Sequence, residues 1–168
     1  MILYHGSYKA IEKPDLSFSR LQTDFGKGFY LTPLKTQAAN WARRFVRERG
    51  GAVLSAYEFL PHADDALSPD VKILKFDAYH LEWLRFITSC RQGQPIDTEW
   101  DLVIGGVAND KVFDTLQLFL DKLIGAEEAI GRLRYDKPNI QYCFKKQSLI
   151  DRYLHFVDSE TLDAEVIK

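Results

Sequence analysis

The sequence predicts a single α+β domain, and three observations support this. The chain has 168 residues, of which 46% are hydrophobic and 13% aromatic, enough for one well-buried core but few for two. Short segments with strand character recur along the chain, and longer segments with helical spacing lie between them. We expect residues 1–157 to form the domain and residues 158–168 to form an acidic, frayed C-terminal tail.

Six segments have the character of strands. One of them ends at Pro33, which is compatible with a strand end. Another contains Gly105 and Gly106, which indicate a bulge or a close approach of the backbone. The expected strands are residues 2–4, 29–32, 52–60, 71–76, 101–107 and 139–144.

Three segments have apolar residues at helical spacing. In residues 34–49 these are Ala38, Trp41, Ala42 and Phe45. The pair Gly50-Gly51 should end this helix. Residues 79–91 form the second predicted helix, and residues 111–134 form the third, interrupted near Gly125. Residues 145–157 are compatible with either a helix or a strand.

Two segments near the N-terminus carry the strongest functional signal. They are Tyr4-His5-Gly6-Ser7 and the Gly-rich residues 24–32, which include Tyr30. Together they place one His, one Tyr and three glycines on short segments with strand character. Trp41 follows on the predicted helix and supplies a second aromatic face. Two such faces around one gap form a slot for a planar heterocycle such as nicotinamide.

These segments resemble the ADP-ribosyltransferase fold of the diphtheria-toxin and poly(ADP-ribose)-polymerase type, over residues 2–45. They look most like a family of bacterial domains of unknown function that is often found in toxin–antitoxin-like gene pairs. The resemblance implies a split β-sandwich of two mostly antiparallel sheets, with flanking helices and an NAD cleft. The helix that begins at Leu34 should lie behind one sheet.

The resemblance also implies roles for individual residues. His5 would hold the nicotinamide-side ribose of NAD, and the backbone of Gly6 would bind the carboxamide. Tyr30 would stack on the nicotinamide ring, and Trp41 would close the other side. Ala38 stands where the polymerases carry a Ser that meets the carboxamide, so Ser7 is a candidate for that contact.

Gln141 is the best candidate for the third signature position, where the polymerases have a Glu. An amide can hydrogen-bond a ribose hydroxyl, but it cannot act as a general base. The expected catalytic set is therefore His5, Tyr30 and Gln141, with transfer of a single ADP-ribose rather than chain elongation.

Further candidates have an ordinary structural role as the alternative to a functional one. Arg20 would pair with the NAD pyrophosphate or lie on the surface. Gly28 beside Tyr30 suggests backbone that is exposed to a ligand. The histidines His62, His80 and His155 are expected to be structural or exposed. Four arginines, Arg43, Arg44, Arg47 and Arg49, form a solvated helix face or bind a polyanion.

Composition limits the partners and the location. The net charge is −2 and the pI is about 6.1, so the overall charge requires neither a nucleic acid nor an acidic membrane. Cys90 and Cys143 have no metal spacing and no disulfide framework. No apolar run is long enough for a membrane span. We expect a cytoplasmic protein without a metal whose fold begins almost at Met1, leaving no room for a leader peptide.

The function predicted on this basis is NAD-dependent mono-ADP-ribosyl transfer with release of nicotinamide, with NAD as co-substrate and NAD hydrolysis as a side activity. The partners implied are a macromolecular acceptor, either protein or nucleic acid, and an antitoxin protein. Two alternatives stay open. One is a non-catalytic module that binds NAD or ADP-ribose, and the other is an NAD-dependent RNA 2′-phosphotransferase.

Overall fold

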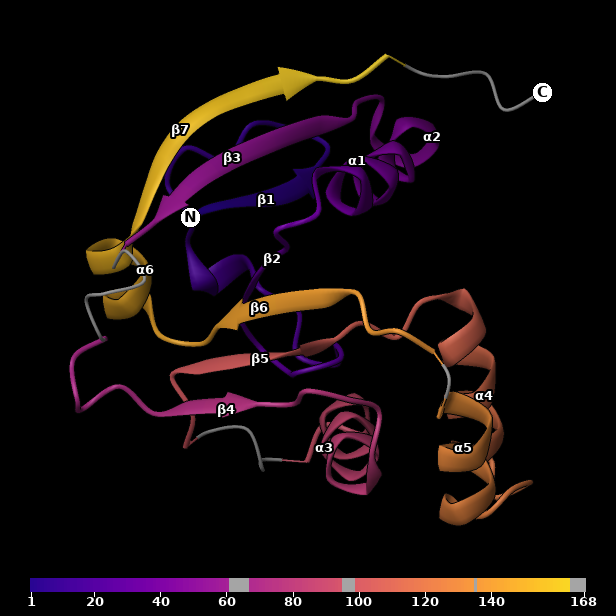
Figure 1. The fold of residues 1–168 in the computed structure, drawn as a ribbon. Coiled ribbons are helices and arrows are strands. Elements are labelled where there is room, and N and C mark those ends of the chain that lie inside the picture. Colours follow the sequence, from indigo (N-terminus) through magenta and orange to yellow (C-terminus); the bar gives the residue numbers. More distant parts are fainter. Residues whose placement is uncertain (61–66, 95–98, 135, 164–168) are drawn as a thin grey trace.

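The computed structural model describes residues 1–60, 67–94, 99–134 and 136–163. Within them the fold is α+β, with two mostly antiparallel sheets and helices around them (Figure 1). In chain order the elements are β1 (Ile2–Ser7), the 3-10 helix η1 (Leu16–Phe18), β2 (Phe29–Leu31), α1 (Lys35–Arg43), α2 (Phe45–Arg49), β3 (Val53–Phe59), β4 (Ile73–Lys75), α3 (Leu81–Arg91), β5 (Leu102–Gly106), α4 (Asp110–Leu120), α5 (Ala126–Leu133), β6 (Ile140–Phe144), α6 (Gln147–Tyr153) and β7 (Leu154–Thr161).

One backbone bridge joins the two sheets in the described part of the chain. The three-stranded sheet has the order β1-β3-β7, and the four-stranded sheet has the order β2-β6-β5-β4. All pairs are antiparallel except β4 with β5. Tyr4 of β1 forms an isolated bridge with Thr32, just after β2, through backbone hydrogen bonds of 2.8 and 3.0 Å. The Thr32 hydroxyl also donates to the carbonyl of Ile140 in β6, at 2.9 Å. Thr32 therefore ties three strands together.

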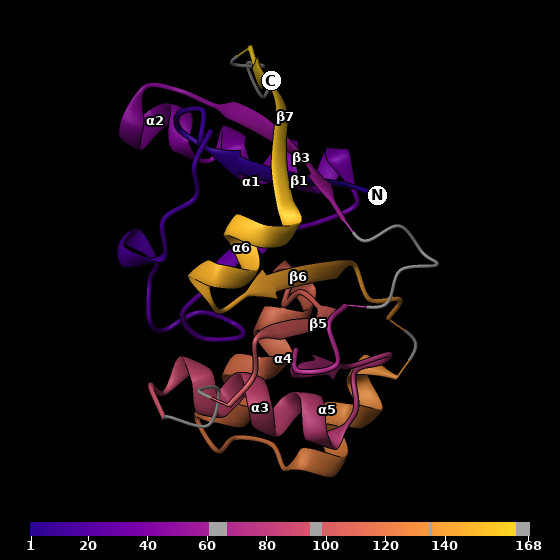
Figure 2. The ribbon, with the colours of Figure 1, turned by 90° about the vertical axis from the view of Figure 1, so that its left-hand side faces the viewer.

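Two hydrophobic cores support the sheets. The first lies between the four-stranded sheet and the helices α3, α4 and α5, and its largest side chain, Trp83, donates to the carbonyl of Gly106 at 3.1 Å. The second lies between the two sheets and includes Leu3, Phe29 and Phe144. Helix α6 connects β6 to β7 and closes one end of this second core (Figure 2).

Most predicted elements are confirmed, with differences at their ends. The expected helix over residues 34–49 is divided at Arg44 into α1 and α2. Gly50 ends α2 in the left-handed region, at φ 73°, as expected of a helix C-cap. Residues 145–157 contain both alternatives, because α6 is followed directly by β7. Residues 158–161 are paired with β3 and belong to the sheet rather than to a frayed tail.

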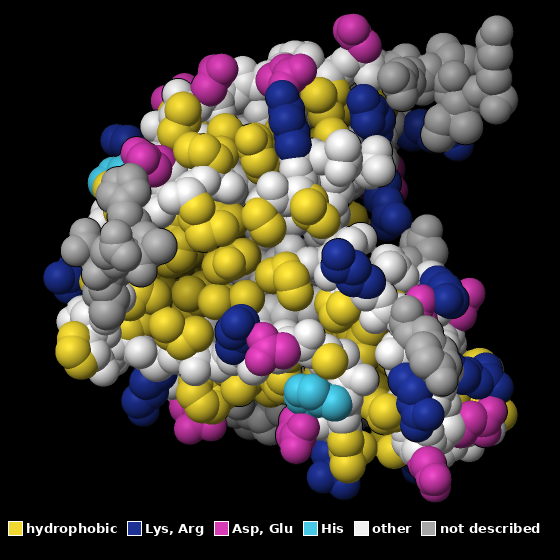
Figure 3. Space-filling model, viewed as in Figure 1, with side chains coloured by type: hydrophobic (Ala, Val, Ile, Leu, Met, Phe, Trp, Pro, Cys, Tyr) yellow, Lys and Arg dark blue, Asp and Glu magenta, His cyan; other side chains and the backbone are white. Residues whose placement is uncertain are grey.

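The face of the molecule seen in Figure 1 carries both hydrophobic and charged side chains. Figure 3 shows hydrophobic side chains gathered over the region between the two sheets. Partly buried members of the second core include Ile104, Tyr142 and Phe156. Among the helices of the described residues, none has the length and apolar character needed to cross a membrane.

His62, for which the sequence predicts a structural or exposed position, lies outside the described residues.

Candidate functional site

The candidate site begins where β1 and β2 separate. In antiparallel strands the backbone N–H and C=O groups of alternate residues point to the same side. Since the backbone of Tyr4 points toward Thr32, the backbone of Gly6 points to that side as well. By the same alternation, the backbone of Tyr30 points back toward β1. In the described part of the chain the two strands share only the Tyr4–Thr32 bridge. Beyond it, strand-edge groups of Gly6 and Tyr30 face the space between the strands.

The side chain of His5 reaches across this separation. Its Nδ1 lies 2.8 Å from the carbonyl oxygen of Tyr30, and its ring lies on Phe29 with the centroids 4.5 Å apart. Because a carbonyl only accepts, Nδ1 must carry a proton and donate it. Burial lowers the pKa of His5, against the opposing effect of the hydrogen bond to Tyr30. The imidazole is thus neutral near pH 7, and its Nε2 is an acceptor that suits a hydroxyl group.

The side chain of Tyr30 is held by the Gly-rich loop that precedes it. Its hydroxyl donates to the Gly26 carbonyl at 2.6 Å and accepts from the Phe25 N–H at 3.0 Å. The Thr23 hydroxyl lies 2.8 Å away. Burial raises the pKa of Tyr30 well above its usual value. The hydroxyl therefore stays protonated and fixes the position of the ring, which packs against the first core and is half-buried.

Tyr30 and Gln141 lie on the same face of the four-stranded sheet. Tyr30 is directly opposite Cys143 in the β2–β6 pair, and Gln141 precedes Cys143 by two residues, so its side chain points to the same side. His5 contacts Phe29, whose side chain belongs to the second core on the other side of the sheet. His5 therefore contacts the backbone of Tyr30 from the Phe29 side of the sheet, whereas the side chains of Tyr30 and Gln141 lie on the other side. The structure brings the three residues to neighbouring strands but does not place their side chains on one face.

The two glycines of the site are explained by packing. A Cβ on Gly6 would lie 2.1 Å from the Ala38 carbonyl oxygen, so α1 rests directly on β1. A Cβ on Gly28 would lie 2.3 Å from the sulfur of Cys143. Gly28 is buried against β6, and contact of its backbone with a ligand remains a prediction.

Trp41, Ser7 and Arg20 occupy different surroundings. Trp41 lies on α1 with 48% of its surface exposed, and its ring contacts Phe45 and the guanidinium of Arg44. Ser7 is buried at the end of β1. Arg20 is exposed on the loop before β2. The stacking slot between Tyr30 and Trp41 and the pyrophosphate contact of Arg20 remain predictions.

Asp24 is a central residue that the sequence analysis did not single out. One of its oxygens accepts from Nε of Arg91 at 3.0 Å and from Nη2 of the same guanidinium. The other accepts from the N–H of Ala108 at 3.0 Å and lies 3.4 Å from Nε2 of Gln141. The available signal was its place at the start of the Gly-rich segment. Nothing in the sequence indicates that Arg91, 67 residues later, is its partner.

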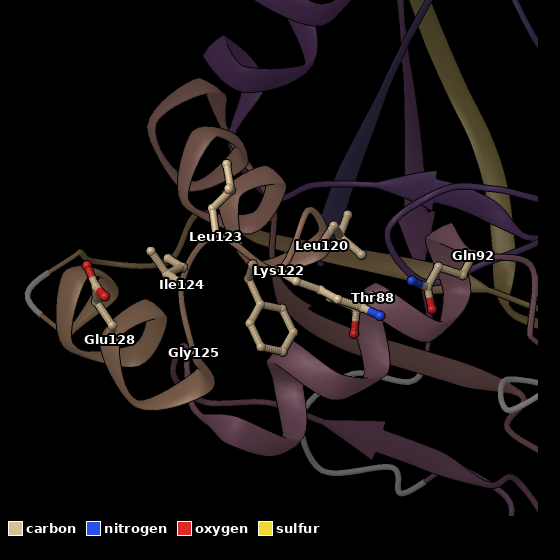
Figure 4. Close-up of a pocket in the computed structure, with 9 residues that line it drawn as sticks. Thr88, Gln92, Leu120, Lys122, Leu123, Ile124, Gly125 and Glu128 are labelled. Atoms are coloured by element: carbon tan, nitrogen blue, oxygen red, sulfur yellow. The ribbon is translucent and has the colours of Figure 1, made fainter.

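A pocket of about 480 Å³ lies elsewhere (Figure 4). Its residues come from the end of α3, from the end of α4, from the connection to α5 and from α5 itself. They are Thr88, Gln92, Phe119, Leu120, Lys122, Leu123, Ile124, Gly125 and Glu128. None of the predicted site residues is among them, so this pocket is separate from the candidate site. In the described residues no group of three or more His, Cys, Asp or Glu side chains is arranged to hold a metal ion.

The comparisons with known proteins identify a family but no activity. A family model described as "Protein of unknown function (DUF3990)" matches residues 1–156. The searches of curated proteins and of solved structures give no match.

Proposed function

Because the chain belongs to the DUF3990 family of proteins of unknown function, its activity has to be inferred from its residues, and we propose that it is an NAD-dependent mono-ADP-ribosyltransferase. The observation that carries the proposal is the junction of β1 and β2, where His5 donates to the carbonyl of Tyr30 beside the Tyr4–Thr32 bridge, with Gln141 on the adjoining strand β6. Two mostly antiparallel sheets that touch at one bridge agree with the split β-sandwich that the motifs imply.

The strand-edge groups of Gly6 suit a carboxamide. A primary amide has one carbonyl acceptor and an NH₂ donor, and a residue at a strand edge offers the matching N–H and C=O. Nicotinamide is such an amide on an aromatic ring. The fixed ring of Tyr30 supplies an aromatic face near this edge, and an offset-stacked or edge-to-face aromatic contact contributes about 0.5–1.5 kcal/mol beyond burial.

Two neutral acceptors would hold the ribose. Nε2 of His5 is unprotonated at pH 7, and Gln141 carries an amide oxygen. Both can accept a hydrogen bond from a hydroxyl without a charge. Positioning is the main task of such a site, because nicotinamide leaves NAD without protonation and the transition state resembles an oxocarbenium ion. The bond between C1′ and nicotinamide breaks, an acceptor nucleophile bonds to C1′, and the acceptor loses its proton to solvent or to its own base.

The setting of the reaction follows from the same proposal. We infer a cytoplasmic protein, where NAD is available and where the buried thiols of Cys90 and Cys143 stay reduced. The acceptor is a macromolecule, and a partner protein would restrain the activity if the chain is a toxin. The arginines of α1 and α2 and the exposed Trp41 form a surface on which such an acceptor would bind.

Release of nicotinamide from NAD tests the proposal. The wild-type chain should release nicotinamide and label a protein or RNA fraction from adenylate-labelled NAD, and His5→Ala should weaken NAD binding by about 1 kcal/mol or more. His155→Ala is the matched control, because His155 is exposed on β7. His80 is unsuitable, since its ring caps α3 at the N–H of Trp83. Equal NAD affinity in both variants would place the site elsewhere.

A non-catalytic reader of NAD or ADP-ribose is the second candidate. Gln141 favours it, because an amide at this position supplies no base. A reader binds NAD in calorimetry and releases no nicotinamide, whereas the transferase does both.

A further inference from the structure

The carboxylate of Asp24 is surrounded by donors from three parts of the fold. Arg91 comes from the end of α3, Ala108 from the segment after β5, and Gln141 from β6. The side chains of Asp24 and Arg91 are 16% and 21% exposed. The hydroxyls of Tyr30 and Tyr79 lie near enough to interact electrostatically with this carboxylate. Asp24 is thus a mostly buried anion, neutralised by one guanidinium and placed beside the candidate site.

An ionised carboxylate can only accept hydrogen bonds, so it determines which way the amide of Gln141 points. The NH₂ group must face Asp24, at 3.4 Å, and the oxygen Oε1 must face away from it. Oε1 takes part in no hydrogen bond among the described residues, and it is not one of their fully enclosed polar atoms. Gln141 as a whole is buried, with 8% of its surface exposed. Its amide nitrogen is occupied by Asp24, while its oxygen can still accept a hydrogen bond.

We propose that Asp24 is a positioning residue that holds Gln141 with its amide oxygen toward the nicotinamide-side ribose, where it accepts a hydrogen bond from a hydroxyl. This inference rests on the proposed function. It explains how an amide serves at a position that resembles the Glu site of the polymerases: the anion next to it fixes the amide as an acceptor. Arg91 holds the anion in place.

The arrangement predicts an unusual behaviour of Gln141→Glu. A second carboxylate beside Asp24 would be repelled by it, which raises the pKa of the pair. The introduced carboxyl group would then keep a proton at neutral pH, donate it to Asp24 and turn its carbonyl oxygen to the ribose. The single variant should therefore release nicotinamide at about the wild-type rate. An added negative charge near the oxocarbenium-like transition state would instead raise this rate.

Asp24→Asn, in contrast, should turn the amide of Gln141 and lower the activity. The oxygen of the new amide would remain on Arg91, and its NH₂ would then face both the N–H of Ala108 and the NH₂ of Gln141. Gln141 would turn over and present a donor to the ribose in place of an acceptor. Adding Gln141→Glu in this background should restore the acceptor, because the NH₂ introduced at position 24 can donate to an ionised carboxylate at position 141. The donor and the acceptor at positions 24 and 141 have then exchanged places, while the N–H of Ala108 lacks its acceptor in both variants that carry Asn at position 24.

The test is this double-mutant cycle, with nicotinamide release and NAD affinity measured for each variant. Asp24→Asn should lower kcat on the order of tenfold with a smaller change in NAD affinity, as for a lost hydrogen bond felt mainly in the transition state. The double variant should recover most of this loss. Asp114→Asn, on the exposed side of α4, is the control and should leave kcat unchanged. A double variant no better than Asp24→Asn would overturn the proposal and leave Asp24 as a structural anchor.

A second measurement keeps the inference independent of turnover. The pKa of the carboxyl group introduced at position 141, followed by carbon-13 NMR, should be raised in Gln141→Glu and should return to its ordinary range or below in the double variant. An ordinary pKa in the single variant would show that Asp24 does not face position 141 and would overturn the proposal, also if Asp24→Asn fails to fold. If the wild type releases no nicotinamide, the proposed function fails, while the pKa still decides whether Asp24 orients this side chain.

Discussion

Replacement of Gly6 by Ala should destabilise the fold strongly. The new methyl group would lie 2.1 Å from the carbonyl oxygen of Ala38 and 2.9 Å from the N–H nitrogen of Ala42. Both atoms belong to the backbone of α1, so no side-chain rotation can make room. Either α1 moves away from β1 or β1 bends.

The magnitude follows from the kind of contact. Overpacking a well-packed core typically costs about 1–3 kcal/mol, and a collision with helix backbone belongs at the upper end, so we expect about 3 kcal/mol. For a chain of this length each kcal/mol lowers Tm by about 2–4 °C, which gives a decrease of about 6–12 °C.

Thermal unfolding followed by circular dichroism measures this effect. Gly131→Ala is the matched control, because Gly131 lies inside α5 and a Cβ there meets nothing within 4 Å. It should gain about 1 kcal/mol from helix propensity and raise Tm. A Gly6→Ala variant with the Tm of the wild type would refute the close packing of α1 on β1. It would also leave ligand binding as the remaining reason for glycine at this position.

Three further predictions concern the site. Tyr30→Phe should cost about 1–3 kcal/mol of stability, because the N–H of Phe25 loses its acceptor, while calorimetry should show NAD affinity largely kept, since the ring remains; a large loss of affinity would assign the hydroxyl to the ligand. Trp41→Ala should weaken NAD binding and leave Tm nearly unchanged, since about half of Trp41 is exposed; unchanged binding would remove Trp41 from the slot. Burial lowers the pKa of His5 in the folded chain, so the unfolded chain binds more protons as the pH falls through about 6.5, the ordinary value for His. The wild type should therefore lose stability as the pH falls through this value, relative to His5→Gln, as measured by urea unfolding at each pH; parallel curves for the two proteins would contradict this.

The sequence predicted the elements well because their patterns are local. Alternation marked β3, and the glycine at position 50 marked the end of α2. Residues 145–157 were ambiguous because seven residues of helix precede the strand directly. Neither the helical spacing nor the strand alternation of apolar residues extends far enough there to dominate the sequence pattern.

Contacts between distant segments could not be predicted in the same way. Asp24 and Arg91 are 67 residues apart, and Asp24 and Gln141 are 117 apart. Only the folded sheet brings these residues together. The sequence also suggested that Gly28 faces a ligand, whereas its reason is the sulfur of Cys143 on a strand more than one hundred residues away. A Gly-x-Gly pattern indicates that there is no room for a side chain, but it does not tell whether a ligand or another part of the protein fills the space.

The C-terminal strand has a consequence for how copies of the protein behave at high concentration. β7 is the outer strand of its sheet, and no other strand of the described residues pairs with its second edge. Its last residues include Asp158 and Glu160, both exposed, and Glu160 also forms an ion pair with Lys35. Charged side chains at a sheet edge oppose the addition of a further strand. The acidic end of the chain therefore protects the fold against edge-to-edge aggregation while it completes the sheet.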